Sequence, residues 1–75
     1  MSRCLLHVKK LDDFQNWLTD RNFDWRAGRG EFQVMQVHYD NKWLVIYSRI
    51  EMPEHFTVDK RLEQLVRRYI KSRGD

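Results

Sequence analysis

The chain has very little of the material that small domains use to brace a weak core. It contains one cysteine, Cys4, and one proline among 75 residues, so no disulfide can form within it. The three histidines are scattered and, with the single cysteine, lack the spacing of a zinc site. A lone thiol is typical of a reducing compartment. We therefore predict a cytoplasmic protein that holds no metal and no other cofactor.

Long apolar runs are also missing. The first residues, 1–6, hold too short an apolar run for a signal peptide, and no stretch approaches the roughly 18 apolar residues of a membrane span. We therefore expect no contact with a membrane. What remains is one small domain, residues 1–75, whose three Trp, three Tyr and four Phe supply bulky side chains for a core of limited size.

Positive charge is scarce over most of the chain and concentrated near its end. Residues 1–59 hold eight Lys/Arg and nine Asp/Glu, whereas residues 60–75 hold six Lys/Arg and two Asp/Glu. The net charge of +3 therefore arises in the last segment. An asymmetry of this kind marks the last segment as a candidate contact with nucleic acid.

The stretch 31–47 predicts a β-hairpin. Val, Ile and aromatic residues dominate its two halves, and a polar turn, Asp40–Lys42, separates them. Both faces of the hairpin are partly apolar, and we place Val34 and Val45 in the core. A sheet covered on one face alone would alternate more cleanly. Either the two helices cover different parts of the sheet, or one face meets a partner.

The flanking segments complete an α+β fold. Apolar residues recur at helical spacing over 11–20 and over 59–73, and Asp59 is a fitting N-cap for the second helix. Alternation predicts a strand over 3–9, and briefer strands are expected at 23–26 and 55–58. The predicted order is β-α-β-β-(β)-α, an antiparallel sheet packed against two helices.

Two smaller features belong to this prediction. A loop is expected around Pro53, because proline cannot donate a hydrogen bond to a sheet. Gly74 supplies a stop for the last helix.

No grouping of residues indicates catalysis. Cys4 and His7 are the nearest nucleophile and base, but residues three apart on a strand point to opposite faces. Glu31 begins one hairpin strand, whereas the opposite strand, 43–47, contains no acid to complete a nuclease site. We therefore predict that the protein is not an enzyme and has no catalytic residues.

The best functional signal is the basic side of the last helix. Its Lys and Arg could neutralise phosphates of DNA or RNA, which gives a salt-dependent affinity, although such residues also line the solvated side of many helices. Arginines in the glycine-containing connection 23–30 could extend this surface, or that connection could be a flexible turn. The candidate nucleic-acid-binding residues are Arg26, Arg29, Lys60, Arg61, Arg67, Arg68 and Lys71.

Two segments of the chain resemble small phage-encoded proteins of unassigned function. They are Trp25–Val37 and Met52–Val58, the latter followed by matching residues between Arg61 and Ile70. The resemblance covers most of the chain. It implies a phage or prophage origin and a role in the cytoplasm of a bacterial host cell. Because such proteins have no assigned function, the resemblance implies little about chemistry.

A looser likeness is architectural. The expected order of helices and strands is similar to double-stranded-RNA-binding-like folds, including the HicA-type toxins. Those toxins carry Gly-Ser-His at a strand start, where this chain has Gly30-Glu31-Phe32. Because the histidine is missing, the likeness implies a fold and not ribonuclease activity.

The hairpin aromatics support an alternative function. Tyr39 and Trp43 could anchor a protein interface, as exposed aromatics often do. They could equally stack on bases or fill the core. The alternative is an inhibitor or modulator of a host enzyme that binds through Tyr39 and Trp43. A homodimer through the hairpin fits either function.

Overall fold

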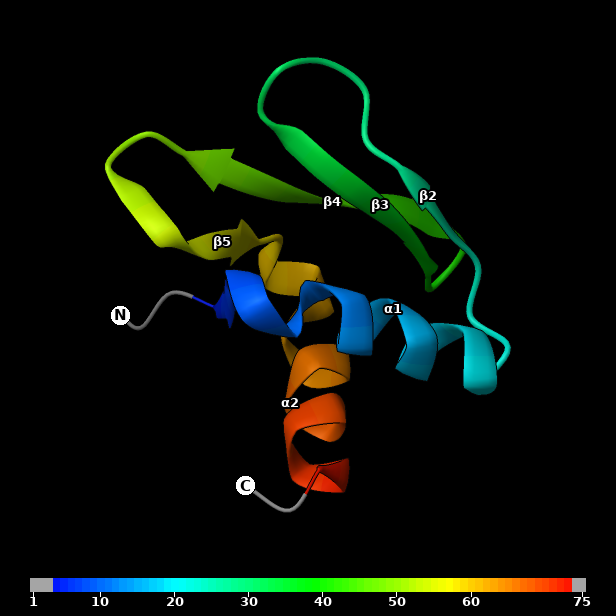
Figure 1. The fold of residues 1–75 in the computed structure, drawn as a ribbon. Helices are drawn as coiled ribbons and strands as arrows, with labels where there is room; N and C mark the ends of the chain where they lie inside the picture. The colour runs from blue at the N-terminus through cyan, green and yellow to red at the C-terminus, as the bar shows by residue number, and fades with distance from the viewer. Residues whose placement is uncertain (1–3, 74–75) are drawn as a thin grey trace.

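The computed structural model describes residues 4–73 of the chain. Within this range five strands form one antiparallel sheet, and α1 and α2 both pack on the same face of it (Figure 1). The predicted α+β fold is confirmed. The elements are β1 (Leu5–His7), η1 (Val8–Lys10, a 3-10 turn), α1 (Leu11–Asp20), β2 (Trp25–Ala27), β3 (Gln33–Tyr39), β4 (Lys42–Arg49), β5 (Met52–Val58), η2 (Lys60–Leu62, a second 3-10 turn) and α2 (Glu63–Ser72).

The order of strands across the sheet is β1-β5-β4-β3-β2. β2 to β5 follow one another as a meander, and β1 lies beside β5, with Leu6 opposite Phe56. The expected strands at 23–26 and 55–58 are therefore present as β2 and β5. β1 and β2, at the two edges of the sheet, are three residues long. Such short edge strands offer little template for pairing with another chain.

The turn between β3 and β4 shows why the hairpin forms. Asp40 and Asn41 have φ angles of 54° and 62°. A two-residue connection between twisted antiparallel strands requires this left-handed region, and Asp and Asn tolerate it better than most residues. Lys42, predicted in the turn, begins β4 opposite Tyr39.

We predicted that the face of the hairpin that carries Val45 is buried. The structure buries the opposite face. Met35 and Val37 of β3 pair with Ile46 and Leu44 of β4, and all four side chains are buried beneath the helices. Val45 points to the other face and is only half-buried. Because neighbouring residues of a strand point to opposite faces, a change of one position exchanges the faces. Apolar residues on both faces left the pattern ambiguous.

An aromatic cluster joins the helices to each other. The Phe14 and Trp17 rings of α1 lie 5.0 and 5.6 Å from the Tyr69 ring of α2, in edge-to-face geometry. α1 has the predicted bounds. α2 begins at Glu63, later than predicted, because the residues before it form η2. Asp59 caps this 3-10 turn, since its Oδ1 accepts a hydrogen bond of 2.9 Å from the backbone N–H of Arg61.

Pro53 lies inside β5 rather than in a loop, so that prediction is wrong. The pairs between β1 and β5 run from His55 to Thr57, so they leave out Pro53, near the start of the strand. Proline is tolerated at such positions because no ladder hydrogen bond needs its missing N–H. Gly74 and residue 3 of the predicted first strand lie outside the described residues.

Candidate functional site

The basic residues of the last segment do not form one continuous surface. Arg61 donates two hydrogen bonds, of 3.1 and 2.9 Å, to the carboxylate of Asp59. These bonds hold the pKa of Asp59 below its ordinary value. Arg67 forms an ion pair of 2.6 Å with Glu63, one helical turn away. Each of these arginines has its charge balanced locally, which reduces what it offers to a phosphate.

Lys60 lies in a region of mixed charge. Together with Arg61 it borders a shallow depression that is also lined by Tyr39, Asp40, Glu63 and Gln64. The acids in this depression offset the cations. It is therefore a poorer phosphate site than the sequence alone indicated.

Arg68 and Lys71 are the remaining cations of α2, and a third cation joins them. Arg21, at the C-terminal end of α1, lines the same depression as Arg68 and Lys71. Sequence reasoning missed Arg21. One local signal could have found it, since Arg21 follows Trp17 by four residues, which places the two on one side of a helix.

Arg26 lies on the opposite side of the sheet from α2. Its Nε donates a hydrogen bond of 2.6 Å to Oε1 of Gln36, the residue it pairs with in β3. Its guanidinium carbon lies 4.0 Å from the centre of the Trp43 ring. Arg29 is exposed in the loop after β2, where its backbone N–H donates to Gln33. Arg26 therefore does not extend the basic side of the last helix.

The sheet face that α1 and α2 leave uncovered is called here the open face (Figure 1). Its side chains alternate along the strands with those of the buried face. They include all three histidines of the chain. Asp24, just before β2, lies opposite His38 and on the same side as Arg26. The open face consists of Leu5, His7, Arg26, Gln33, Gln36, His38, Trp43, Val45, Tyr47, His55 and Thr57.

Trp43 and Tyr47 are the exposed aromatics of the open face. Each is 39% exposed, although both are large apolar side chains on a sheet. Trp43 lies beside His38, with ring centres 5.0 Å apart, and beneath Arg26. Tyr39, its predicted companion in a protein interface, lies on the other face, where it packs against Phe23 with ring centres 6.2 Å apart. The structure therefore separates Tyr39 from Trp43.

A short chain of hydrogen bonds fixes Arg26 over Trp43. Gln36, only 7% exposed, accepts from Arg26 and donates from its Nε2 to Oε1 of Gln33 at 3.0 Å. The same oxygen of Gln33 accepts from the backbone N–H of Arg29 at 3.1 Å. These bonds orient the Arg26 guanidinium over Trp43 without a ligand.

Other candidate chemistry is limited in the described part of the chain. Among residues 4–73, no group of three His, Cys, Asp or Glu is placed to hold a metal ion. His7 and His55 lie edge to face across the strands, with ring centres 5.0 Å apart. Cys4 is half-buried beside the core, and burial raises the pKa of its thiol, which disfavours the reactive thiolate. No helix in this range is long and apolar enough to cross a membrane.

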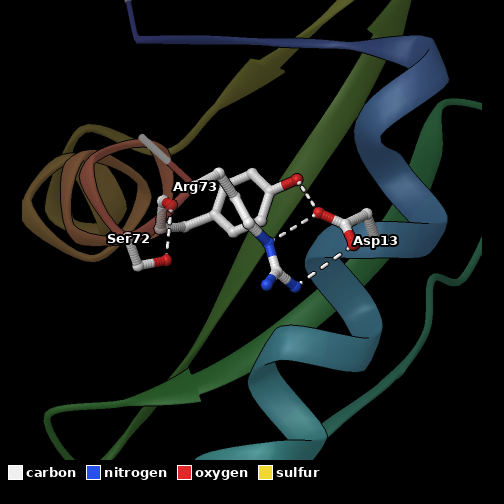
Figure 2. Close-up of polar contacts among 4 residues, drawn as sticks. Asp13, Ser72 and Arg73 are labelled. Atoms are coloured by element: carbon white, nitrogen blue, oxygen red, sulfur yellow. Dashed lines mark hydrogen bonds and ion pairs between the residues drawn. The ribbon is translucent and has the colours of Figure 1, made fainter. Parts of the chain in front are cut away.

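Asp13, in the first turn of α1, is hydrogen-bonded to residues at the C-terminal end of α2 (Figure 2). Its carboxylate accepts a hydrogen bond of 2.6 Å from the Tyr69 hydroxyl and two, of 2.9 and 3.1 Å, from Arg73. Ser72 donates to the backbone carbonyl of Tyr69 at 2.8 Å. Burial, and next the bond to Asp13, raise the pKa of Tyr69 to about 12. These contacts are structural, since each group already has its partner.

The contacts of Asp13 with Tyr69 and Arg73 predict that the stability of the protein falls in acid. The hydrogen bond from Tyr69, aided by Arg73, lowers the pKa of Asp13, so the unfolded chain takes up a proton there more readily than the folded one. The stability from Asp13 is therefore present above its unfolded pKa, about 4, and is lost as the pH falls through the lowered folded value. In Asp13→Asn, the free energy of unfolding should therefore decrease less steeply as the pH falls.

The measurement is urea unfolding at several values between pH 5 and pH 2, about the range in which carboxylates titrate. Asp12→Asn, the same change at the neighbouring exposed residue, is the matched control and should keep the acid-sensitive slope. If the free energy of unfolding of Asp13→Asn fell with pH as steeply as that of the unchanged protein, the contacts of Asp13 would not couple stability to pH.

Comparison with protein family models, with curated proteins and with solved structures finds no match to this chain. The resemblance to small phage-encoded proteins stays a prediction. The open face and the group around Arg21, Arg68 and Lys71 are therefore the features from which a function can be inferred.

Proposed function

We propose that the protein binds single-stranded nucleic acid on the open face of its sheet and catalyses no reaction. The observation that carries this proposal is the exposed Trp43 beneath Arg26 on the open face. Stacking of unpaired bases on aromatic side chains of an open antiparallel sheet is one established mode of RNA recognition. Bases of DNA and RNA both present the π-face that such stacking uses.

The spacing along β4 suits more than one base. Trp43, Val45 and Tyr47 alternate along one strand and point to the same face. At about 3.4 Å per residue, Trp43 and Tyr47 are separated by roughly 14 Å along the strand. The two rings can therefore receive separate bases, with the half-buried Val45 between them as an apolar floor.

Arg26 supplies the charge that this surface needs. Its Nε is occupied by Gln36, so the terminal nitrogens of the guanidinium can meet a phosphate. A guanidinium plane also stacks on bases, and its position over Trp43 lets it extend the stack. The neighbouring imidazole of His38 adds a polar edge without introducing negative charge.

One observation favours protein binding as a second candidate. Phe32, Tyr47 and Ile50 are 46%, 39% and 83% exposed, and they border a hollow of about 350 Å³ near the β4–β5 turn. Clustered exposed apolar residues commonly mark protein interfaces. In this case the protein would act as a modulator of another protein, such as the host enzyme expected for a phage product.

The proposed function is tested by fluorescence anisotropy with labelled single-stranded DNA and RNA of 12 nucleotides and with a duplex of equal length. We expect the single strands to bind more tightly than the duplex and to be released by salt. Trp43→Ala should weaken binding roughly five- to a hundredfold, since one base stack contributes about 1–3 kcal/mol.

Two arginine variants locate the site. Arg26→Gln and Arg67→Gln each remove one positive charge, the first from the open face and the second from α2. We expect Arg26→Gln to weaken binding severalfold and Arg67→Gln to change it little. A larger loss for Arg67→Gln would place the contact on the last helix. A folded protein that binds neither the single strands nor the duplex would reject nucleic-acid binding and leave the hollow at Ile50 as the candidate surface.

A further inference from the structure

Three cations and one tryptophan share a depression on the helical side of the sheet. Arg21 of the α1 end and Arg68 and Lys71 of α2 line a depression of about 270 Å³ together with Trp17 and Ser72. The guanidinium carbon of Arg21 lies 5.0 Å from the centre of the Trp17 ring. Arg21, Arg68 and Lys71 are called the cation cluster.

In the described part of the chain, side chains leave the positive charge of the cation cluster unpaired. Within residues 4–73, no ion pair involves any of its three members. α1 and α2 both end nearby, and a helix C-terminus carries about half a negative charge. Two such ends offset about one of the three positive charges. An excess of roughly two therefore faces the depression, which is what a doubly charged anion requires.

Trp17 contributes an independent observation. Its side chain is 3% exposed, and its Nε1–H is buried without an acceptor in the described structure. An indole N–H is a donor only, and a buried donor without an acceptor is destabilising. By contrast, Nε1 of Trp25 donates to Oγ1 of Thr19 at 2.9 Å. Trp17 also lines the depression, so a ligand bound there would lie beside the residue that carries this unpaired N–H.

We propose that the cation cluster binds the phosphate group of a small phosphorylated molecule. Arg21 and Arg68 can each present paired N–H donors to phosphate oxygens, Lys71 adds a point charge, and the Trp17 N–H donates to a further oxygen after a small movement of the side chains above it. The depression lies just below the range of about 300–1,000 Å³ that is typical of ligand pockets, which favours a small ligand. This site is separate from the open face.

The test follows the three tryptophan indole N–H signals by ¹⁵N NMR during titration with inorganic phosphate, with sodium chloride adjusted to keep the ionic strength constant. We expect the Trp17 signal to move and saturate, while the Trp25 signal stays in place as an internal control. A shift that never saturates, or equal movement of all three signals, would overturn the proposal.

Matched variants test the residues. Arg68→Gln combined with Lys71→Gln should weaken phosphate binding at least tenfold. Arg67→Gln, on the same helix but paired with Glu63, should change it less than twofold. Equal effects of these changes would show that phosphate responds to the overall positive charge and would overturn the proposal of a specific site. Trp43→Ala should leave phosphate binding intact, so this result stands or fails independently of the open face.

The source of the phosphate group is distinguished by three further ligands. Adenosine monophosphate should move the Trp17 signal at lower concentration than inorganic phosphate, whereas adenosine should not move it. A 12-nucleotide single strand that moves it at lower concentration than the mononucleotide would overturn the assignment to a small molecule and point to a nucleic-acid backbone.

Discussion

Replacing Phe14 by alanine should leave most of the protein unfolded at 25 °C. Phe14 is fully buried, and its ring lies 6.1 Å from that of Trp17 and 5.0 Å from that of Tyr69. Removing a buried Phe side chain costs about 3–5 kcal/mol, because the surroundings collapse only partly onto the cavity. A core of this size usually contributes a net stability of only about 3–5 kcal/mol. The stability lost in Phe14→Ala is therefore comparable with the total stability of the protein.

Near-ultraviolet circular dichroism and urea unfolding measure this effect. Phe32→Ala is the matched control, since Phe32 is 46% exposed, and its change should cost less than about 1 kcal/mol. If Phe14→Ala kept its near-ultraviolet spectrum and unfolded at the same urea concentration as Phe32→Ala, the aromatic cluster would not be what holds α1 to α2.

Gly28→Ala should detach β2 from the sheet. A Cβ at Gly28 would overlap the backbone oxygen of Gln33 and lie 2.5 Å from its backbone carbon. The Gly28 N–H also donates to the carbonyl of Val34. Since the obstruction is backbone, it cannot rotate away, and overpacking of this kind costs about 1–3 kcal/mol. Detachment of β2 would also carry Arg26 away from Trp43.

Gly30→Ala is the matched comparison for Gly28→Ala, because it introduces backbone strain without a steric overlap. Gly30 has a φ of 85°, but the space around its missing Cβ is empty. Its replacement should cost about 1–2 kcal/mol through the left-handed conformation alone and should leave β2 paired. Urea unfolding gives the two costs, and the hydrogen exchange of the β2 amides reports detachment. A larger loss, or faster exchange in β2, for Gly30→Ala would contradict the steric explanation.

The parts of the fold that depend on nearby residues were predictable. α1 follows from apolar spacing within ten residues, and the turn at Asp40–Asn41 follows from the residues that tolerate positive φ. The buried face of the hairpin was not predictable, because Val45 and Ile46 are both good core residues and only the helices choose between them. The pairing of Leu6 with Phe56 joins segments that no local pattern connects.

The candidate sites were predictable only in part. Arg68 and Lys71 were marked by charge, but their neighbour Arg21 comes from the other helix. Arg26 was expected near the last helix and instead contacts Trp43, because β2 places it on the open face. Gly28 lies in the connection 23–30, for which a flexible turn was one expectation, whereas the structure requires it for close approach to Gln33. In each case the deciding contact spans different elements.

The pairing of β1 with β5 has a consequence for how the chain is made. β2 to β5 are joined by short connections and can assemble as they leave the ribosome. β1 and α1 are synthesised first, but β1 has no neighbouring strand until β5 exists, and α1 has no Tyr69 to pack against until α2 does. Contacts between such distant segments form slowly. The earliest residues to be synthesised are therefore among the last to complete their packing, since Leu6 lacks Phe56 until β5 is made and Phe14 lacks Tyr69 until α2 is made.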